Sequence, residues 1–161
     1  DCLWKGLADG TIQTVSTDHC SFTTEQKKLG EGDFTKIPGG MPGGETRGTL
    51  IYTYGVDKGR ITKEDMCRVL SENPAKLYGL YPRKGVIAPG SDADLVIMRT
   101  GVEDVITAKD QVQNVDYAPF EGTKVTGRVV SVFLRGLQAV KDGKVVEEKK
   151  GEFLKRGKYA L

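Results

Sequence analysis

Histidine is nearly absent from this chain. His19 is the only one, and the three cysteines include no CxxC pair. A catalytic zinc site takes about three protein ligands of the His, Asp, Glu or Cys type, so this chain cannot assemble such a site from histidines and paired cysteines alone. The odd number and wide spacing of the cysteines also argue against a disulfide framework. We expect reduced thiols in a cytoplasmic protein.

Long apolar runs and a strong net charge are missing as well. No run approaches the ~20 apolar residues that cross a bilayer, and 24 basic against 22 acidic side chains leave a net charge of +2. Neither feature supports binding to nucleic acid or to a membrane. The N-terminal residues also lack the charged, apolar and small-residue order of a signal peptide. With 161 residues, 38% of them hydrophobic, the chain has the size and composition of one soluble globular domain.

The first 44 residues predict a short helix, a strand and a long loop. In CLWKGLA (2–8) the apolar residues have the spacing of an amphipathic helix. TIQTVSTD (11–18) predicts a strand, and the reactive-looking residues stand at its carboxyl end, as in an α/β barrel. Residues 23–44 predict a polar loop that ends in IPGGMPGG (37–44), where few side chains keep a ligand from the backbone. Because the chain has no initial Met and begins as if inside a helix, we expect a fragment of a longer protein.

The next part of the chain predicts three helices. Residues 45–58 place their apolar side chains on one helical face. Thr62 and Asp65 have the spacing of a capping box before a second amphipathic helix. Asn73, which is followed by proline, predicts the N-cap of a further short helix that Gly79 ends.

From about residue 82 the sequence predicts short β-strands. Apolar runs are split by Pro-Gly and Ser-Asp turns, and Asp142-Gly143 between two apolar pairs predicts a hairpin. This change of pattern predicts a boundary near Pro82. We therefore divide the chain into a helical part (1–81), a β-sandwich portion (82–150) and a charged, exposed tail (151–161).

Asp18, His19 and Cys20 stand side by side in VSTDHCSF (15–22). An aspartate after a strand is most often a turn or capping residue, and a lone histidine is more often a hydrogen-bonded structural residue than a ligand. Cys20 is predicted to be a small buried hydrophobe. A nucleophile–His–Asp triad is not supported, because successive strand residues point to opposite faces. From these residues alone the chemistry is incomplete.

Four stretches of the chain carry a family resemblance. They are STDHCSF (16–22), GDFTKIP (32–38), ENPAKLYGLYPRKGVIAPGSDADLVI (72–97) and DYAPFEGTKVTGRVVSVFLRG (116–136). In this order they resemble the carboxyl-terminal third of a dihydropyrimidinase or D-hydantoinase, which are cyclic-amide hydrolases of the amidohydrolase superfamily. The third stretch is shared across many amidohydrolases, whereas DHCSF with GDFTKIP narrows the resemblance to the hydantoinase branch.

The resemblance implies a (β/α)₈ TIM barrel, with its last strand and helices in residues 1–81, followed by part of a small β-sandwich. It implies two divalent metal ions, usually zinc, bridged by a carboxylated lysine and held by histidines upstream of this chain. Asp18 matches the family aspartate that binds one metal and passes a proton from the attacking metal-bound hydroxide to the leaving ring nitrogen. Gly39 stands where the family has an asparagine, in a stretch whose backbone contacts the substrate.

The implied function is the opening of a hydantoin or dihydropyrimidine ring by a homotetramer. The isolated chain is expected to be inactive, because the other metal ligands are absent from it. Three alternatives stay open. The chain could be a non-catalytic scaffold or assembly domain, although the non-catalytic branch of the family typically lacks the aspartate that matches Asp18. It could belong to a dihydroorotase or an allantoinase, or it could be a subunit that completes a barrel with a partner chain.

Overall fold

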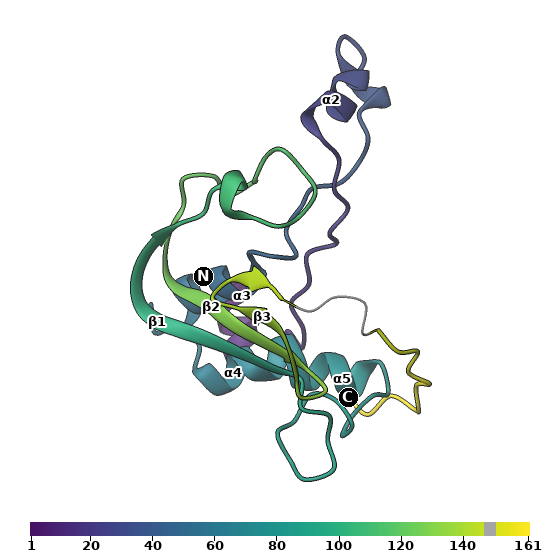
Figure 1. Cartoon of the computed structure of the whole chain (residues 1–161), viewed down its shortest axis with the longest axis vertical. Coiled ribbons are helices and arrows are strands. Elements are labelled where there is room, and N and C mark those ends of the chain that lie inside the picture. Colours follow the sequence, from purple (N-terminus) through teal and green to yellow (C-terminus); the bar gives the residue numbers. More distant parts are fainter. Residues whose placement is uncertain (147–150) are drawn as a thin grey trace.

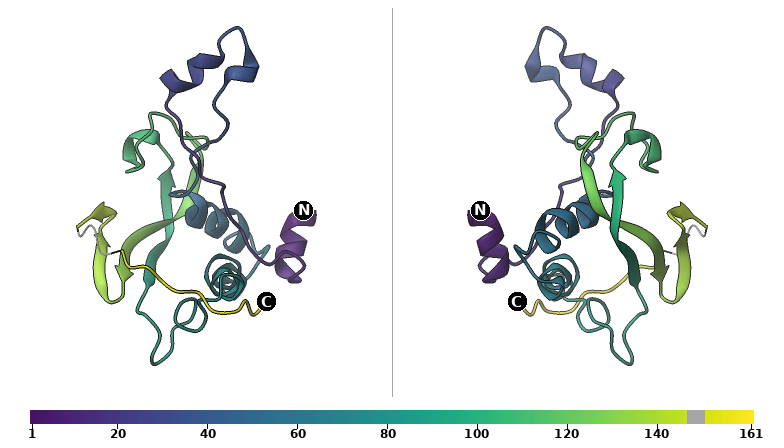
Figure 2. Two further views of the ribbon diagram at one scale, coloured as in Figure 1. Left: turned by 90° about the vertical axis from the view of Figure 1, so that its right-hand side faces the viewer. Right: turned by 90° about the vertical axis from the view of Figure 1, so that its left-hand side faces the viewer.

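A layer of helices packs against an antiparallel sheet in the computed structural model of this chain, which describes residues 1–146 and 151–161. Figure 1 shows a narrow arm, which carries the helix labelled α2, projecting from this two-layer body. In both views of Figure 2 the central helices lie between the sheet and the N-terminal helix. Within the described part of the chain, every helix is too short or too polar to cross a bilayer.

The regular elements run from helices to strands along the chain. The α-helices are α1 (Cys2–Ala8), α2 (Thr24–Lys27), α3 (Arg47–Ile51), α4 (Lys63–Cys67) and α5 (Asn73–Leu77). The 3₁₀ and π segments are η1 (Lys28–Gly30), η2 (Phe34–Lys36), η3 (Tyr52–Val56), η4 (Arg68–Glu72) and η5 (Ala108–Asp110). The strands are β1 (Leu95–Val105), β2 (Lys124–Leu134), β3 (Leu137–Lys141) and β4 (Lys144–Val145).

The predicted helices at 2–8 and 45–58 are confirmed, and so is the capping box. The second of these consists of α3 and η3, and Gly59, with φ of 65°, follows its last turn. At the start of α4 the Thr62 hydroxyl accepts the Asp65 N–H at 3.0 Å, while Asp65 Oδ2 accepts the Thr62 N–H at 3.0 Å. These two bonds satisfy backbone donors that a helix start leaves without partners.

The predicted role of Asn73 as the N-cap of a separate helix is wrong. α4 continues through η4 into α5, and Asn73 has helical angles, with φ of −65° and ψ of −42°. Its buried amide donates to the carbonyl oxygen and to the side-chain oxygen of Gln13, each at 2.8 Å, and it does not cap the helix. The π-helical turn before Pro74 accommodates a residue that has no N–H to donate. Gly79, with φ of 65°, ends the helix as predicted.

The predicted strand at 11–18 is also not formed. This segment is extended, but its backbone N–H groups find scattered partners, with Ile12 donating to Gly6 and Val15 donating to Val69. A strand needs a parallel or antiparallel neighbour that offers a continuous ladder. No described residue offers that ladder here, so the alternating pattern gives an extended segment only.

The sheet contains β1 to β4 in sequence order, and every neighbouring pair is antiparallel. The long strands β1 and β2 form its main ladder, which two register shifts interrupt. The hairpin predicted at Asp142-Gly143 is confirmed. Both residues have positive φ values, 49° and 76°, as a tight hairpin turn requires.

Two apolar clusters lie in the body. Leu7, Ile61 and Val69 are buried among the helices, while Ile106, Ala118 and Val125 are buried beside the sheet with Leu50 of α3 packed against them. The two layers also meet directly. A side chain at position 127 would force a neighbour to move, because its Cβ would lie 2.5 Å from the Tyr52 ring. The Thr126 N–H also donates to the Thr53 hydroxyl at 3.1 Å.

The tail is exposed, as predicted, but it is not a free arm. Residues 151–161 have no regular secondary structure, while residues 147–150 lie outside the described part of the chain. The Gly157 N–H donates to the Gly79 carbonyl oxygen at 2.7 Å, and the Ala160 N–H donates to the Lys76 carbonyl oxygen at 3.0 Å. Lys76 lies in the last turn of α5 and Gly79 follows that helix, and the Lys76 carbonyl oxygen also accepts the Gly79 N–H at 3.1 Å. These two bonds attach the tail to the C-terminal end of α5.

Candidate functional site

Asp18 stands exposed in the extended segment that precedes the arm. Its φ of 47° lies in the left-handed region, which aspartate tolerates better than most residues. Among the residues that the structure describes, none forms a hydrogen bond or ion pair with its carboxylate. Both carboxylate oxygens are thus available to a ligand or a proton.

His19 connects this segment to the glycine-rich loop. Its Nδ1 accepts the backbone N–H groups of Gly43 and Gly44, at 3.0 Å and 3.1 Å. A ring nitrogen that accepts carries no proton, so the proton of the neutral ring lies on Nε2. The predicted hydrogen bonding of His19 is confirmed.

Cys20 packs against the same loop. Its N–H donates to the Met41 carbonyl oxygen at 3.3 Å, and a Cβ at Gly40 would lie 2.3 Å from the Cys20 carbonyl oxygen. Only a glycine fits there, and its φ of 128° also favours glycine. The prediction that Cys20 is buried is wrong, because the loop covers its backbone and leaves the thiol exposed and free.

Lys27 holds the other end of the loop, which the sequence did not indicate. Its ammonium donates to the carbonyl oxygens of Pro38 and Gly40, the second at 2.7 Å, and lies 5.3 Å from the centre of the Phe22 ring. Between these two carbonyl groups, the N–H and C=O of Gly39 form no hydrogen bond with any described residue. A Cβ at Gly39 would meet nothing within 4 Å, so the position faces open space.

The arm is tied to the body at its base. Asp116 Oδ1 accepts the Thr24 N–H at 2.8 Å, and this bond is the main reason that the pKa of Asp116 lies below its ordinary value. On the other side of the base, the Glu45 carboxylate accepts the N–H groups of Val112 and Gln113 at 3.0 to 3.1 Å. These bonds fix where the loop leaves and re-enters the body.

An apolar cavity of about 530 Å³ lies beside the loop, between α3 and the segment before β2. Its lining includes Thr17 and Gly43, which also pack against each other. The other lining residues are Trp4, Ser16, Met41, Pro42, Thr46, Arg47, Leu50, Ile51, Tyr54, Pro119, Phe120 and Thr123. The cavity thus borders the segment that carries Asp18 with a mainly apolar wall.

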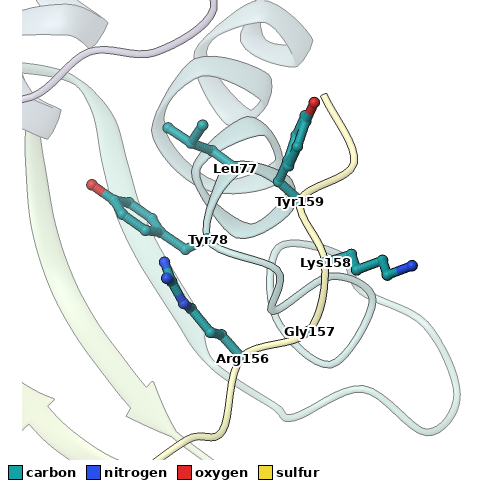
Figure 3. A pocket seen from close by; sticks show the side chains of 6 residues that line it. All are labelled: Leu77, Tyr78, Arg156, Gly157, Lys158 and Tyr159. Atoms are coloured by element: carbon teal, nitrogen blue, oxygen red, sulfur yellow. The ribbon is translucent and has the colours of Figure 1, made fainter.

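A second pocket lies where the tail meets the end of α5. It measures about 770 Å³ and is lined by Leu77, Tyr78, Arg156, Gly157, Lys158 and Tyr159. In Figure 3 the Arg156 side chain extends toward Tyr78, whereas Lys158 points away from them. Figure 1 places this region at the end of the molecule opposite the arm, so it is separate from the loop that His19 holds.

The donor set of the described residues does not fit a complete metal centre. Residues 1–146 and 151–161 contain no group of three or more His, Cys, Asp or Glu side chains placed to hold an ion. Asp18 offers a free carboxylate, but His19 uses Nδ1 to accept from the loop. The described residues therefore do not form a complete set of metal ligands around Asp18.

The chain belongs to the amidohydrolase family, because the sequence model of that family matches residues 2–146. It is 49% identical over 161 residues to a D-hydantoinase of Geobacillus stearothermophilus, an alignment that covers 99% of this chain and 34% of that relative. The chain thus spans about a third of the length of the curated relatives it matches. The predicted resemblance to the hydantoinase and dihydropyrimidinase group is confirmed.

Solved structures agree with this assignment. The D-hydantoinase of Bacillus sp. AR9 matches with a TM-score of 0.96 at 46% identity, over 99% of this chain and 36% of that one. A D-hydantoinase (dihydropyrimidinase) from Thermus sp. matches with a TM-score of 0.88 at 51% identity, over 92% of this chain and 32% of that one. The described helices and four-stranded sheet therefore have the fold of part of a D-hydantoinase.

Proposed function

We propose that this chain supplies one corner of the active site of a hydantoinase-type cyclic-amide hydrolase. The observation that carries the proposal is the Asp18 carboxylate, which is exposed and has no partner among the described residues. The next residue, His19, holds the loop in which the Gly39 N–H and C=O form no hydrogen bond with a described residue. The relatives named D-hydantoinase support the substrate class. In this proposal residues 1–81 are the end of a (β/α)₈ barrel, 82–150 belong to a β-sandwich, and 151–161 form a tail.

Asp18 has the chemistry of a proton carrier in ring opening. Its carboxylate accepts the proton of the attacking water and then donates it to the ring nitrogen as the carbon–nitrogen bond breaks. Asp18 would also hold one of two divalent metals, usually zinc, which when bound lower the pKa of water and polarise the amide carbonyl. No described residue forms a hydrogen bond or ion pair with the Asp18 carboxylate, so its oxygens are open to take up and release a proton.

Gly39 is proposed to recognise the ring through its backbone. A cyclic diamide presents N–H and C=O groups side by side, and Gly39 offers one free acceptor and one free donor to them. Recognition by the backbone does not need a particular side chain, so it tolerates glycine where the family has asparagine. The absence of a Cβ also leaves the open space in front of this peptide unobstructed.

The remaining metal ligands are proposed to lie in a longer polypeptide of which this chain is part, assembled as a cytoplasmic homotetramer. The 161-residue chain alone is then expected to be inactive. Turnover of hydantoin by the purified chain, with zinc supplied, would contradict this expectation.

The test is Asp18→Asn in the longer protein. We expect turnover of hydantoin and dihydrouracil, followed by ring-opening absorbance, to fall at least a thousandfold while the circular dichroism spectrum is unchanged. Asp57→Asn is the matched control, since Asp57 is also exposed and has no side-chain partner among the described residues. An Asp18→Asn protein that keeps the parent's activity would refute the assignment and favour a non-catalytic scaffold.

A further inference from the structure

The backbone of the loop at 38–44 is held from two sides. On one side, His19 Nδ1 accepts the N–H groups of Gly43 and Gly44. On the other side, the Lys27 ammonium donates to the carbonyl oxygens of Pro38 and Gly40. Both side chains reach across sequence separations of 11 to 25 residues. They are therefore tertiary contacts and not part of a local turn.

A glycine-rich loop needs such contacts in order to keep one conformation. Ordering the backbone of one residue costs roughly 1–2 kcal/mol, and glycine loses more conformational freedom than any other residue. Four of the seven residues at 38–44 are glycine. Without hydrogen bonds to fixed side chains, the Gly39 peptide groups would sample many orientations, and a ligand would have to order them on binding.

We propose that His19 and Lys27 are positioning residues, which together fix the loop so that the Gly39 N–H and C=O are preorganised for a cyclic amide. This inference rests on the proposed function, because it names the groups that hold the substrate-binding backbone in place. Neither side chain touches the reacting atoms. Their effect is on substrate binding, through the conformation of a loop that they hold at both ends.

A single atom, His19 Nδ1, accepts both loop N–H groups, so two variants of His19 can be compared, one that keeps an acceptor there and one that does not. Asparagine places its Oδ1 near the position of His19 Nδ1 and can accept the same N–H groups, whereas glutamine carries its oxygen one bond further out. His19→Asn should therefore preserve the loop and His19→Gln should release it. For the other end, Lys27→Met removes the ammonium and keeps a long side chain.

Steady-state kinetics of the longer protein with hydantoin provide the first test. We expect His19→Gln and Lys27→Met each to raise KM at least tenfold with a smaller change in kcat, and His19→Asn to stay within threefold of the parent. Lys28→Met is the matched control, since Lys28 makes an exposed ion pair with Glu25 and no bond to the loop. An unchanged KM in both releasing variants, or an equal loss in His19→Asn and His19→Gln, would overturn the proposal.

Amide hydrogen exchange separates this inference from the proposed function. The Gly43 and Gly44 amides should exchange at least tenfold faster in His19→Gln than in His19→Asn, because their acceptor is lost only in the first. If the longer protein does not open cyclic amides, the proposed function fails, and these exchange rates alone decide whether His19 orders the loop. Equal exchange in the two variants would overturn the inference.

Discussion

Replacing Asp65 by asparagine removes one charge from the centre of a small hydrogen-bond network. Asp65 Oδ2 accepts the Thr62 N–H at 3.0 Å and the Thr62 hydroxyl at 2.9 Å, while Oδ1 accepts from Arg68 Nη2 at 2.9 Å. The same Arg68 nitrogen donates to the Leu7 carbonyl oxygen at 2.6 Å. The network therefore caps α4 and joins it to α1.

The pKa of Asp65 sets the magnitude of the expected effect. The hydrogen bond from Arg68, followed by those from Thr62, lowers this pKa from 3.8 to about 2. At about 1.4 kcal/mol for each tenfold change in proton affinity, the difference corresponds to about 2.5 kcal/mol. Because the Asp65 side chain is 20% exposed, water screens part of this interaction. We expect Asp65→Asn to lower the free energy of unfolding by about 1–2 kcal/mol at neutral pH.

The effect should also depend on pH in a defined direction. A carboxyl group whose pKa is lower in the folded chain stabilises that chain above the unfolded pKa, and this contribution is lost as the pH falls through the folded pKa. For Asp65 these values are 3.8 and about 2. The difference between the parent and Asp65→Asn should be complete above about pH 5, about half as large near pH 3, and small near pH 2.

Urea denaturation followed by circular dichroism, at neutral pH and near pH 3, measures both quantities. Glu64→Gln is the control, because it removes a charge from the same first turn at an exposed position and should cost only a few tenths of a kcal/mol. The reasoning is refuted if Asp65→Asn costs no more than Glu64→Gln at neutral pH. It is also refuted if the difference from the parent does not shrink in acid.

Two glycine positions give further predictions. Gly79 has a φ of 65°, and a Cβ there would lie only 2.3 Å from the Gly157 carbonyl oxygen. Gly59 has the same φ, and a Cβ there would meet no atom within 4 Å, so Gly59→Ala is the control. We expect limited proteolysis to cut the tail faster in Gly79→Ala than in Gly59→Ala. Equal cleavage would contradict the attachment of the tail to the end of α5. Gly127→Ala, whose Cβ would lie 2.5 Å from the buried Tyr52 ring, should lower the free energy of unfolding in urea by about 1–3 kcal/mol. Adding Tyr52→Leu should restore part of that loss, and no recovery would contradict the steric explanation.

The sequence by itself determined the features that neighbouring residues create. The capping box of Thr62 and Asp65 and the hairpin at Asp142-Gly143 each depend on atoms within three residues of one another. The helix end at Gly79 likewise depends on a conformation that glycine adopts readily. Such interactions form with little loop-closure entropy, so a short pattern specifies them.

Tertiary structure decided the features in which two patterns compete or distant groups meet. Asn73 could cap a new helix or continue an old one, and the second outcome was decided by its hydrogen bonds to Gln13, 60 residues away. An alternating pattern at 11–18 could not show whether a neighbouring strand exists to pair with it. The residues next to Lys27 in the sequence do not indicate its role, because the fold brings to it the carbonyl groups that it binds. The sequence could therefore indicate Asp18 and the glycine-rich loop, whereas only the folded chain shows how His19 and Lys27 hold that loop beside the segment that carries Asp18.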